Sequence, residues 1–260
     1  MILEVIAGPD EFDSTVSQQP VPSYSSNLIT GKKFRFAYFD DALDHPSLDP
    51  EIAASIKKRM EQLRKDGHSI NPVEFDLLDY IVPAYYVLTT AEASSNLSRY
   101  DGVKYGYRSA EPNLELTEFY KLTRSAGFGK EVKRRIMLGT FVLSAGYYDA
   151  YFTRAQKVRK LLIDKIQLIF SDLPTGQAGF DFILLPTSPV TAFKAGEKMS
   201  DPIAMYLADI YTVMANLAGI PAISLPLFKH SNGMPFGLQV MANRFDELSL
   251  LQVSNLLLGK

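Results

Sequence analysis

Apolar side chains recur every three or four positions between Glu131 and Phe170, and this spacing predicts a long helix with one apolar face. Most charged residues of the stretch fall outside that face. The face consists of Tyr147, Tyr151, Ala155, Val158, Leu162, Ile166 and Ile169. We therefore expect the rest of the chain to be organised around this helix.

Further helices are predicted by the same spacing together with residues that favour helix ends. In the clearest case Asp49 precedes Pro50 at the start of an apolar stripe, and Gly67 follows the end of that stripe. A later helix is expected to begin with Asp201 as its N-cap. The predicted helices are Pro50–Arg64, Val82–Ser98, Leu114–Arg124, Ser200–Leu217 and Glu247–Leu258.

Short apolar and aromatic runs predict five strands, which are Lys32–Phe39, His68–Phe75, Phe182–Leu185, Ala222–Phe228 and Phe236–Ala242. The first two flank a predicted helix, and strands in such a β-α-β unit pair in parallel. Phe182–Leu185 is apolar at every position, as in a strand that is buried on both faces. The pattern therefore predicts an α/β fold, an α/β/α sandwich around a mixed, largely parallel sheet, without a domain boundary.

Composition and charge exclude several kinds of site. The 260 residues are 47% hydrophobic and 22% charged, as in globular proteins, and a net charge of -2 gives no overall attraction to nucleic acid. Because Cys is absent, disulfides and thiolate nucleophiles are excluded, and the three histidines lack the spacing of metal ligands. No apolar run reaches the roughly 18 residues of a membrane span, and the start lacks signal-peptide features. We expect a cytoplasmic protein without a membrane contact or a metal site.

Two places along the chain carry charges in unusual surroundings. Cations crowd between Lys130 and Arg135, at the start of the long predicted helix, where positive charge opposes the helix dipole. The guanidinium groups of Arg134 and Arg135 next to an apolar run suit bidentate binding of a carboxylate, although a solvated helix face is the alternative. Asp209 lies on an otherwise apolar predicted helix, so its carboxylate has to be exposed, paired or hydrogen-bonded.

Small hydroxyl residues gather in the predicted helix Val82–Ser98 around Glu92. They are Thr89, Thr90, Ser94, Ser95 and Ser98. Either they form the polar lining of a groove, or they bond locally to the backbone of their own helix. The sequence leaves both interpretations open.

Several segments, in the same order, resemble the C-terminal half of the amidase signature family. The matching segments are residues 5–17, 85–108, 127–159, 184–193, 201–227 and 233–242. Two of their motifs, EASSNLSRYDG and RRIMLGTFVLSAGYYDAY, resemble the A subunits of glutamyl-tRNA(Gln)/aspartyl-tRNA(Asn) amidotransferases more specifically. The resemblance implies that residues 1–260 are the C-terminal half of a single amidase signature domain, truncated at its N-terminus.

The resemblance also implies where the catalytic residues lie. Family members hydrolyse an amide with a Lys–cis-Ser–Ser triad that lies upstream of the VIAGPD motif, with which this chain opens. Ser94 and Ser95 lack a glycine-rich oxyanion loop and do not replace the triad. We therefore expect no catalytic residue in this chain and no activity from the chain by itself.

For the intact subunit, the resemblance implies a glutaminase that works in a larger complex. It takes the side-chain amide of glutamine and passes the ammonia to the B subunit, within a heterotrimer that also contains the C subunit. The B subunit uses ATP and Mg²⁺ to convert Glu-tRNA(Gln) or Asp-tRNA(Asn), so the misacylated tRNA is reached through that partner. No cofactor is expected in this chain.

The resemblance assigns glutamine recognition to residues of this half. It implies that Arg135 binds the α-carboxylate and Asp209 the α-ammonium group, and that one residue of the pair Tyr85 and Tyr86 joins them. The alternative is that Arg135 and Asp209 pair with each other or with the backbone. Two other functions also stay open: a stand-alone amidase acting on a small amide, which would not need both residues, and a non-catalytic scaffold domain.

Overall fold

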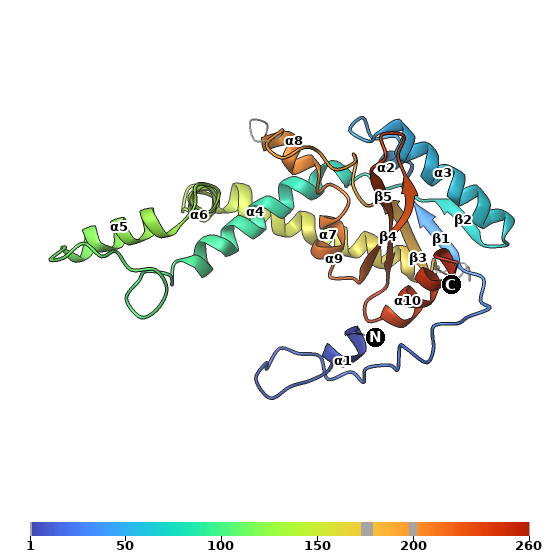
Figure 1. The fold of residues 1–260 in the computed structure, drawn as a ribbon, viewed down its shortest axis with the longest axis horizontal. Helices are drawn as coiled ribbons and strands as arrows, with labels where there is room; N and C mark the ends of the chain where they lie inside the picture. The colour runs from blue at the N-terminus through green and yellow to red at the C-terminus, as the bar shows by residue number, and fades with distance from the viewer. Residues whose placement is uncertain (1, 173–178, 198–201, 260) are drawn as a thin grey trace. The chain divides into compact units, whose positions relative to one another are not determined.

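The computed structural model describes residues 2–172, 179–197 and 202–259 (Figure 1). The chain forms two compact units, which we call the sheet unit (residues 1–78 and 162–260) and the helical unit (residues 79–161). The pattern of the sequence gives no sign of this division. The assignment of both units to one amidase signature domain stays a prediction.

The sheet unit contains a five-stranded sheet in the order β2-β1-β3-β5-β4. Its strands are β1 (Arg35–Tyr38), β2 (Ser69–Pro72), β3 (Phe182–Pro186), β4 (Ala222–Lys229) and β5 (Pro235–Ala242). Strand β1 pairs in parallel with β2 and β3, whereas β5 pairs antiparallel with β3 and β4. The five predicted strands therefore lie in one mixed sheet, which confirms the α/β fold class, with parallel pairing on one side of β3 and antiparallel pairing on the other.

Helices cover this sheet. Helix α3 packs against β2 and β3, and α10 packs against β4 and β5 (Figure 1). All residues of β3 are buried, and because successive side chains of a strand point to opposite faces, both faces of β3 are covered. The helices that lie wholly in this unit are α1 (Ile2–Ile6), α2 (Asp40–Leu43), α3 (Pro50–Lys65), α8 (Pro202–Leu207), α9 (Val213–Ala218) and α10 (Glu247–Leu257).

The sequence predicted α3 accurately because its end signals are local. Asp49 caps the helix, since its Oδ1 accepts hydrogen bonds from the backbone N of Glu51 at 2.8 Å and of Ile52 at 3.4 Å. The predicted stripe is buried, and it consists of Ile52, Ile56, Met60 and Leu63. Burial of this stripe against the sheet supplies most of the stability that a helix of this length needs.

Aromatic side chains fill the core where β1 meets β3. The ring of Phe182 lies 5.2 Å from that of Phe34, edge to face, and 5.7 Å from that of Phe36. All three side chains are buried. Aromatic pairs in such arrangements contribute beyond the area that they bury.

An ion pair joins the starts of β1 and β3. The carboxylate of Asp181 accepts three hydrogen bonds from Arg35. The donors are the backbone N of Arg35 at 2.8 Å, Nε at 3.3 Å and Nη2 at 2.9 Å. Burial raises the pKa of Asp181, but the hydrogen bonds from Arg35 and the positive charges of Lys32 and Arg35 together outweigh burial and leave this pKa below its ordinary value. The pair therefore stabilises the fold in its ionised form.

We expect Asp181→Asn to lower the free energy of unfolding at neutral pH by about 1–3 kcal/mol, the usual effect of losing hydrogen bonds to a charged group. Because the pKa is lower in the folded state, this stabilisation is present above the unfolded pKa of about 3.9 and is lost as the pH falls through the folded pKa. Urea unfolding at several pH values between neutral and acid would measure it. Asp41→Asn, at an exposed carboxylate, is the matched control. A difference between Asp181→Asn and wild type that does not shrink in acid would contradict this account.

The helical unit contains most of α4 (Leu78–Leu97), then α5 (Leu116–Gly127), α6 (Lys130–Val142), the short π-helix η1 (Asp149–Thr153) and the start of α7 (Arg154–Phe170). Helices α4 and α6 cross in backbone contact at Gly139. A Cβ at this position would lie 2.0 Å from the carbonyl oxygen of Thr90 and 2.6 Å from Cβ of Ser94. Next to the crossing, the hydroxyl groups of Ser94 and Thr140 lie 3.0 Å apart.

The prediction of one helix from Glu131 to Phe170 is wrong. The chain ends α6 at Val142, makes a turn, and resumes with η1 and α7. In the turn, the backbone N of Tyr147 and the backbone N of Tyr148 both donate to the carbonyl of Ser144. The Ser144 hydroxyl donates to the carbonyl of Phe141. The predicted apolar face is buried in α7, at Ala155, Leu162, Ile166 and Ile169, whereas Tyr147 and Tyr151 are 45% and 43% exposed.

The predicted helix Ser200–Leu217 is also interrupted. Its expected start at Ser200 and Asp201 lies outside the described residues, and the remainder forms α8, a turn and α9. The reason lies in Tyr211, which is fully buried: its hydroxyl donates to the carbonyl of Ala42 at 2.9 Å. Its own carbonyl accepts a hydrogen bond from Nε2 of Gln239 at 3.1 Å instead of continuing the helix.

The hydroxyl residues of α4 largely bond within their own helix. Thr89 donates to the carbonyl of Tyr85 at 2.8 Å, and Thr90 donates to that of Tyr86 at 2.6 Å. Ser98 donates to the carbonyl of Ser95 at 2.6 Å. Of the two interpretations that the sequence left open, these contacts favour local bonding.

Candidate functional site

Arg135 lies on α6 in the helical unit, one turn after Glu131. Its Nε lies 3.2 Å from Oε1 of Glu131, and its Cζ lies 6.0 Å from the centre of the Tyr86 ring on α4. Arg134 contacts the second oxygen of the same carboxylate, with its Nη1 3.0 Å from Oε2. Glu131 thus offsets part of the positive charge that the sequence places at the start of this helix.

The guanidinium group of Arg135 is held from two sides. Glu131 binds its Nε edge, and the Tyr86 ring lies against it at cation–π distance. No hydrogen bond to Nη1 or Nη2 of Arg135 is found among the described residues, and the side chain is 44% exposed. The guanidinium group is therefore contacted on one edge and one face within a partly exposed side chain, an arrangement compatible with bidentate recognition of a carboxylate.

The two tyrosines that the sequence could not separate have different surroundings. Tyr86 lies against Arg135, whereas Tyr85 packs edge to face on Tyr86, with ring centres 5.3 Å apart. Proximity to Arg135 therefore favours Tyr86. A role of either residue in substrate binding stays a prediction.

Asp209 lies in the sheet unit, in the turn between α8 and α9, and is partly exposed. Its backbone organises that turn, because its carbonyl accepts hydrogen bonds from the backbone N of Val213 and from the Thr212 hydroxyl, both at 3.2 Å. Arg135 belongs to the helical unit and Asp209 to the sheet unit. Their convergence on one ligand stays a prediction.

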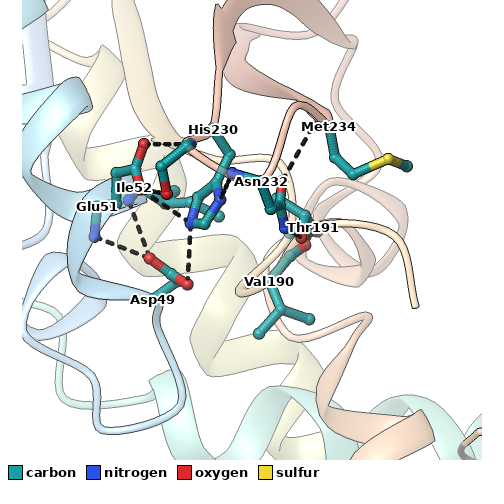
Figure 2. Close-up of polar contacts among 10 residues, drawn as sticks. Asp49, Glu51, Ile52, Val190, Thr191, His230, Asn232 and Met234 are labelled. Atoms are coloured by element: carbon teal, nitrogen blue, oxygen red, sulfur yellow. Dashed lines mark hydrogen bonds and ion pairs between the residues drawn. The ribbon is translucent and has the colours of Figure 1, made fainter. Parts of the chain in front are cut away.

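A polar cluster that the sequence did not reveal ties the tip of the β4–β5 hairpin to the start of α3 (Figure 2). His230 is 13% exposed, and its Nε2 lies 3.2 Å from Oε2 of Glu51 and 3.4 Å from Oδ2 of Asp49. Ser231 donates to Glu51 from its backbone N at 2.7 Å and from its hydroxyl at 2.6 Å. Because Glu51 and Ser231 are 180 positions apart, no spacing rule could have found this cluster, which we call the hairpin clamp.

The hairpin clamp also holds the loop that follows β3. Nδ2 of Asn232 donates to the Thr191 hydroxyl at 3.1 Å (Figure 2), and the backbone N of Asp49 donates to the carbonyl of Pro189 at 2.8 Å. Nδ1 of His230 accepts a hydrogen bond from the backbone N of Asn232 at 3.2 Å. The imidazole tautomer with its proton on Nε2 satisfies all of these contacts, since Nε2–H then faces the two carboxylates.

The other two histidines also have hydrogen-bonding partners. Nδ1 of the buried His68 accepts a hydrogen bond from the backbone N of Phe34 at 3.0 Å, and burial lowers the pKa of His68. Nδ1 of His45 lies 2.6 Å from the Ser47 hydroxyl. Within residues 2–172, 179–197 and 202–259, no group of three or more His, Asp or Glu side chains is arranged to hold a metal ion, and no helix is both long and apolar enough to cross a membrane.

Comparison with known proteins identifies the family of this chain. The family model described as Amidase matches residues 1–251. The chain belongs to the amidase family. Among curated relatives, it is 47% identical over 252 residues to the A subunit of the glutamyl-tRNA(Gln) amidotransferase of Acidobacterium capsulatum, an alignment that covers 97% of this chain and 51% of the relative. It is 48% identical over 254 residues to the A subunit of the enzyme of the same name from Brevibacillus brevis, covering 98% of this chain and 50% of the relative.

Two solved structures share the fold. The crystal structure of the A subunit of glutamyl-tRNA(Gln) amidotransferase from Thermotoga maritima matches with a TM-score of 0.69 and 36% identity, and the match covers 98% of this chain and 48% of that one. A 6-aminohexanoate cyclic dimer hydrolase matches with a TM-score of 0.70 but only 19% identity, which shows a common fold. The chain spans about half the length of the curated relatives it matches.

Proposed function

We propose that this chain is the glutamine-recognising half of the A subunit of a tRNA-dependent amidotransferase. Two observations support this: its identity of 47% and 48% to the A subunits of glutamyl-tRNA(Gln) amidotransferases, and the oriented guanidinium group of Arg135. The second observation carries the proposal, because an arginine held by Glu131 on one edge and by Tyr86 on one face offers its Nη groups to a carboxylate.

In this proposal the amino-acid end of glutamine is bound by charge complementarity. The Nη groups of Arg135 donate two hydrogen bonds to the α-carboxylate, and Tyr86 keeps the guanidinium plane in place. Asp209 accepts hydrogen bonds from the α-ammonium group. Each contact pairs opposite charges, and such hydrogen bonds are stronger than neutral ones.

The chemistry belongs to parts of the complex beyond these residues. The Lys–cis-Ser–Ser triad that we infer for the intact subunit supplies the nucleophile, and the released ammonia passes to the B subunit. That partner, with ATP and Mg²⁺, amidates the misacylated tRNA, and the heterotrimer also contains the C subunit. The preference between Glu-tRNA(Gln) and Asp-tRNA(Asn) does not enter the recognition of glutamine, because both reactions use the same nitrogen donor.

In an amidotransferase whose A subunit has this sequence, we expect Arg135→Ala to lower kcat/KM for glutamine about 10- to 100-fold. The reason is the loss of a charge-assisted hydrogen bond of about 1.5–3 kcal/mol, at roughly 1.4 kcal/mol per factor of ten. Transamidation with added ammonium should continue at the wild-type rate, because free ammonia bypasses the glutamine site. Steady-state kinetics with each nitrogen donor would measure both effects.

Two further variants sharpen this test. Arg134→Ala removes a guanidinium group bound to the same Glu131, with the side chain 50% exposed, and should leave glutamine kinetics nearly unchanged. Arg135→Lys should restore little, because an ammonium group cannot present two parallel donors. If glutamine- and ammonium-driven rates fall equally in Arg135→Ala, the residue is structural and the proposed glutamine site is wrong.

A further inference from the structure

Asn232 and Gly233 form the one Asn-Gly step of the sequence, and they lie at the tip of the β4–β5 hairpin. Both residue types are typical of turns. Gly233 has a φ of +86°, a conformation that residues with a side chain rarely adopt, so the turn itself favours glycine at this position. An Asn-Gly step is also chemically labile, because the unhindered backbone N of the glycine can attack the side-chain amide that precedes it. The hairpin thus contains a reactive step that its own turn geometry favours.

The reaction open to this step is the deamidation of Asn232. The backbone N of Gly233 forms a bond to Cγ of Asn232, the bond between Cγ and Nδ2 breaks, and the proton of the Gly233 N–H leaves with Nδ2 as ammonia. Water then opens the resulting cyclic imide at one of its two carbonyls, which gives aspartate or isoaspartate. Water is the only co-reactant. The Gly233 nitrogen has to be free of other bonds, however, and the amide carbon of Asn232 has to turn toward it.

In the structure both reacting groups are engaged in hydrogen bonds. The backbone N of Gly233 donates to the carbonyl of His230 at 2.8 Å, so the attacking nitrogen is not free. The side-chain amide of Asn232 is bound at both ends (Figure 2). Its Oδ1 accepts a hydrogen bond from the backbone N of Met234 at 2.9 Å, and its Nδ2 donates to the Thr191 hydroxyl at 3.1 Å. The amide therefore cannot turn toward Gly233 without losing these two bonds.

The hairpin clamp holds the turn in this closed state from outside the hairpin. Glu51 on α3 accepts two hydrogen bonds from Ser231, and its Oε2 also lies 3.2 Å from Nε2 of His230. The two anchors outside the hairpin are distant in sequence, since Glu51 lies 180 positions from Ser231 and Thr191 lies 41 positions from Asn232. A peptide that contains the hairpin alone lacks both anchors, so its Asn-Gly step is not held closed by them.

We propose that Asn232 is a latent deamidation site, which the hairpin clamp protects and which reacts when the clamp opens. The rate is then set by the fraction of molecules with an open hairpin tip, because local opening precedes the reaction. Isoaspartate adds a methylene group to the backbone of the turn and has no Nδ2 for the Thr191 hydroxyl, so the clamp does not re-form as before. Neither Arg135 nor Asp209 takes part, so this proposal and the proposed glutamine site can fail separately.

The test is the deamidation rate of Asn232 in the 260-residue chain at neutral pH, followed by peptide mapping with mass spectrometry. A synthetic peptide of residues 227–237 is the unclamped reference, and the wild-type chain should react at least about tenfold more slowly. Glu51→Ala should speed the reaction about tenfold or more and Thr191→Val about threefold to tenfold, the usual effects of losing hydrogen bonds to a charged and to a neutral group. Glu61→Ala, at an exposed carboxylate of the same helix, is the matched control and should react like the wild type.

Three outcomes would overturn the proposal. A wild-type chain that deamidates as fast as the peptide would show that the clamp gives no protection. Equal rates in the wild type, Glu51→Ala and Thr191→Val would show that the clamp does not control the reaction. A rate in Glu61→Ala as high as in Glu51→Ala would show that a general loss of stability opens the site. Should Glu51→Ala fail to fold, Thr191→Val, which replaces a loop hydroxyl by a methyl group, decides between protection and its absence.

Discussion

Replacing Gly139 by alanine should lower the free energy of unfolding of the helical unit by about 3 kcal/mol, the upper end of what overpacking usually costs. The new Cβ would lie 2.0 Å from the carbonyl oxygen of Thr90, and backbone atoms cannot move aside as a flexible side chain can. Alanine favours a helix over glycine by up to about 1 kcal/mol, and the steric cost exceeds this gain. Hydrogen exchange of the α4 and α6 amides would report the opening of this unit.

Gly146→Ala is the matched control for that result. Gly146 lies in the turn after α6 in the same unit, and a Cβ there would meet no atom within 4 Å. We expect its free energy of unfolding to change by no more than about 0.5 kcal/mol. Equal protection from hydrogen exchange in the two variants would show that the close approach at Gly139 carries little energy.

Phe182→Ala should lower the free energy of unfolding of the sheet unit by about 3–5 kcal/mol, as expected when a buried aromatic side chain leaves a cavity. Phe182 lies in the central strand, is fully buried, and contacts the rings of Phe34 and Phe36. Urea unfolding of the chain, compared with the wild type, would measure the loss.

Phe12→Ala removes the same side chain from a site that is 90% exposed, and its free energy of unfolding should differ from the wild type by no more than about 0.5 kcal/mol. If Phe182→Ala and Phe12→Ala unfolded at the same urea concentration, the core of the sheet unit would lie elsewhere than at the β1–β3 contact.

The strands were predictable because their signals are local. The apolar run Phe182–Leu185 predicts a buried strand from four adjacent residues. The helix that follows Asp49 is likewise predicted by signals at its own ends.

Periodicity did not predict the two interrupted helices. The break after Val142 is made by local hydrogen bonds around Ser144, which an apolar pattern does not reveal, whereas the break in Ser200–Leu217 depends on distant partners. Tyr211 leaves the helical path where it bonds to Ala42 and Gln239, which are far away in sequence.

The same distinction applies to the candidate sites. The contact of Arg135 with Glu131 spans four positions on one helix and could be expected from the sequence. Its contact with Tyr86 joins two helices, and the pairing of His230 with Glu51 joins a hairpin to a distant helix, so neither follows from spacing. The resemblance to the amidase family singled out the tyrosine pair, and the structure then distinguished its two members by their neighbours.

The crossing at Gly139 has a consequence for how the site can be damaged. Arg135 lies one turn before Gly139 on α6, and Tyr86 lies one turn before Thr90 on α4. The distance between the Arg135 guanidinium group and the Tyr86 ring thus depends on the close contact of the α4 and α6 backbones. At Gly139 no side chain lies between these backbones that could adjust to a larger residue. For the proposed glutamine site, a mutation at position 139 is therefore expected to abolish recognition while Arg135 and Tyr86 themselves stay unchanged, and inspection of those two residues alone would not reveal the damage.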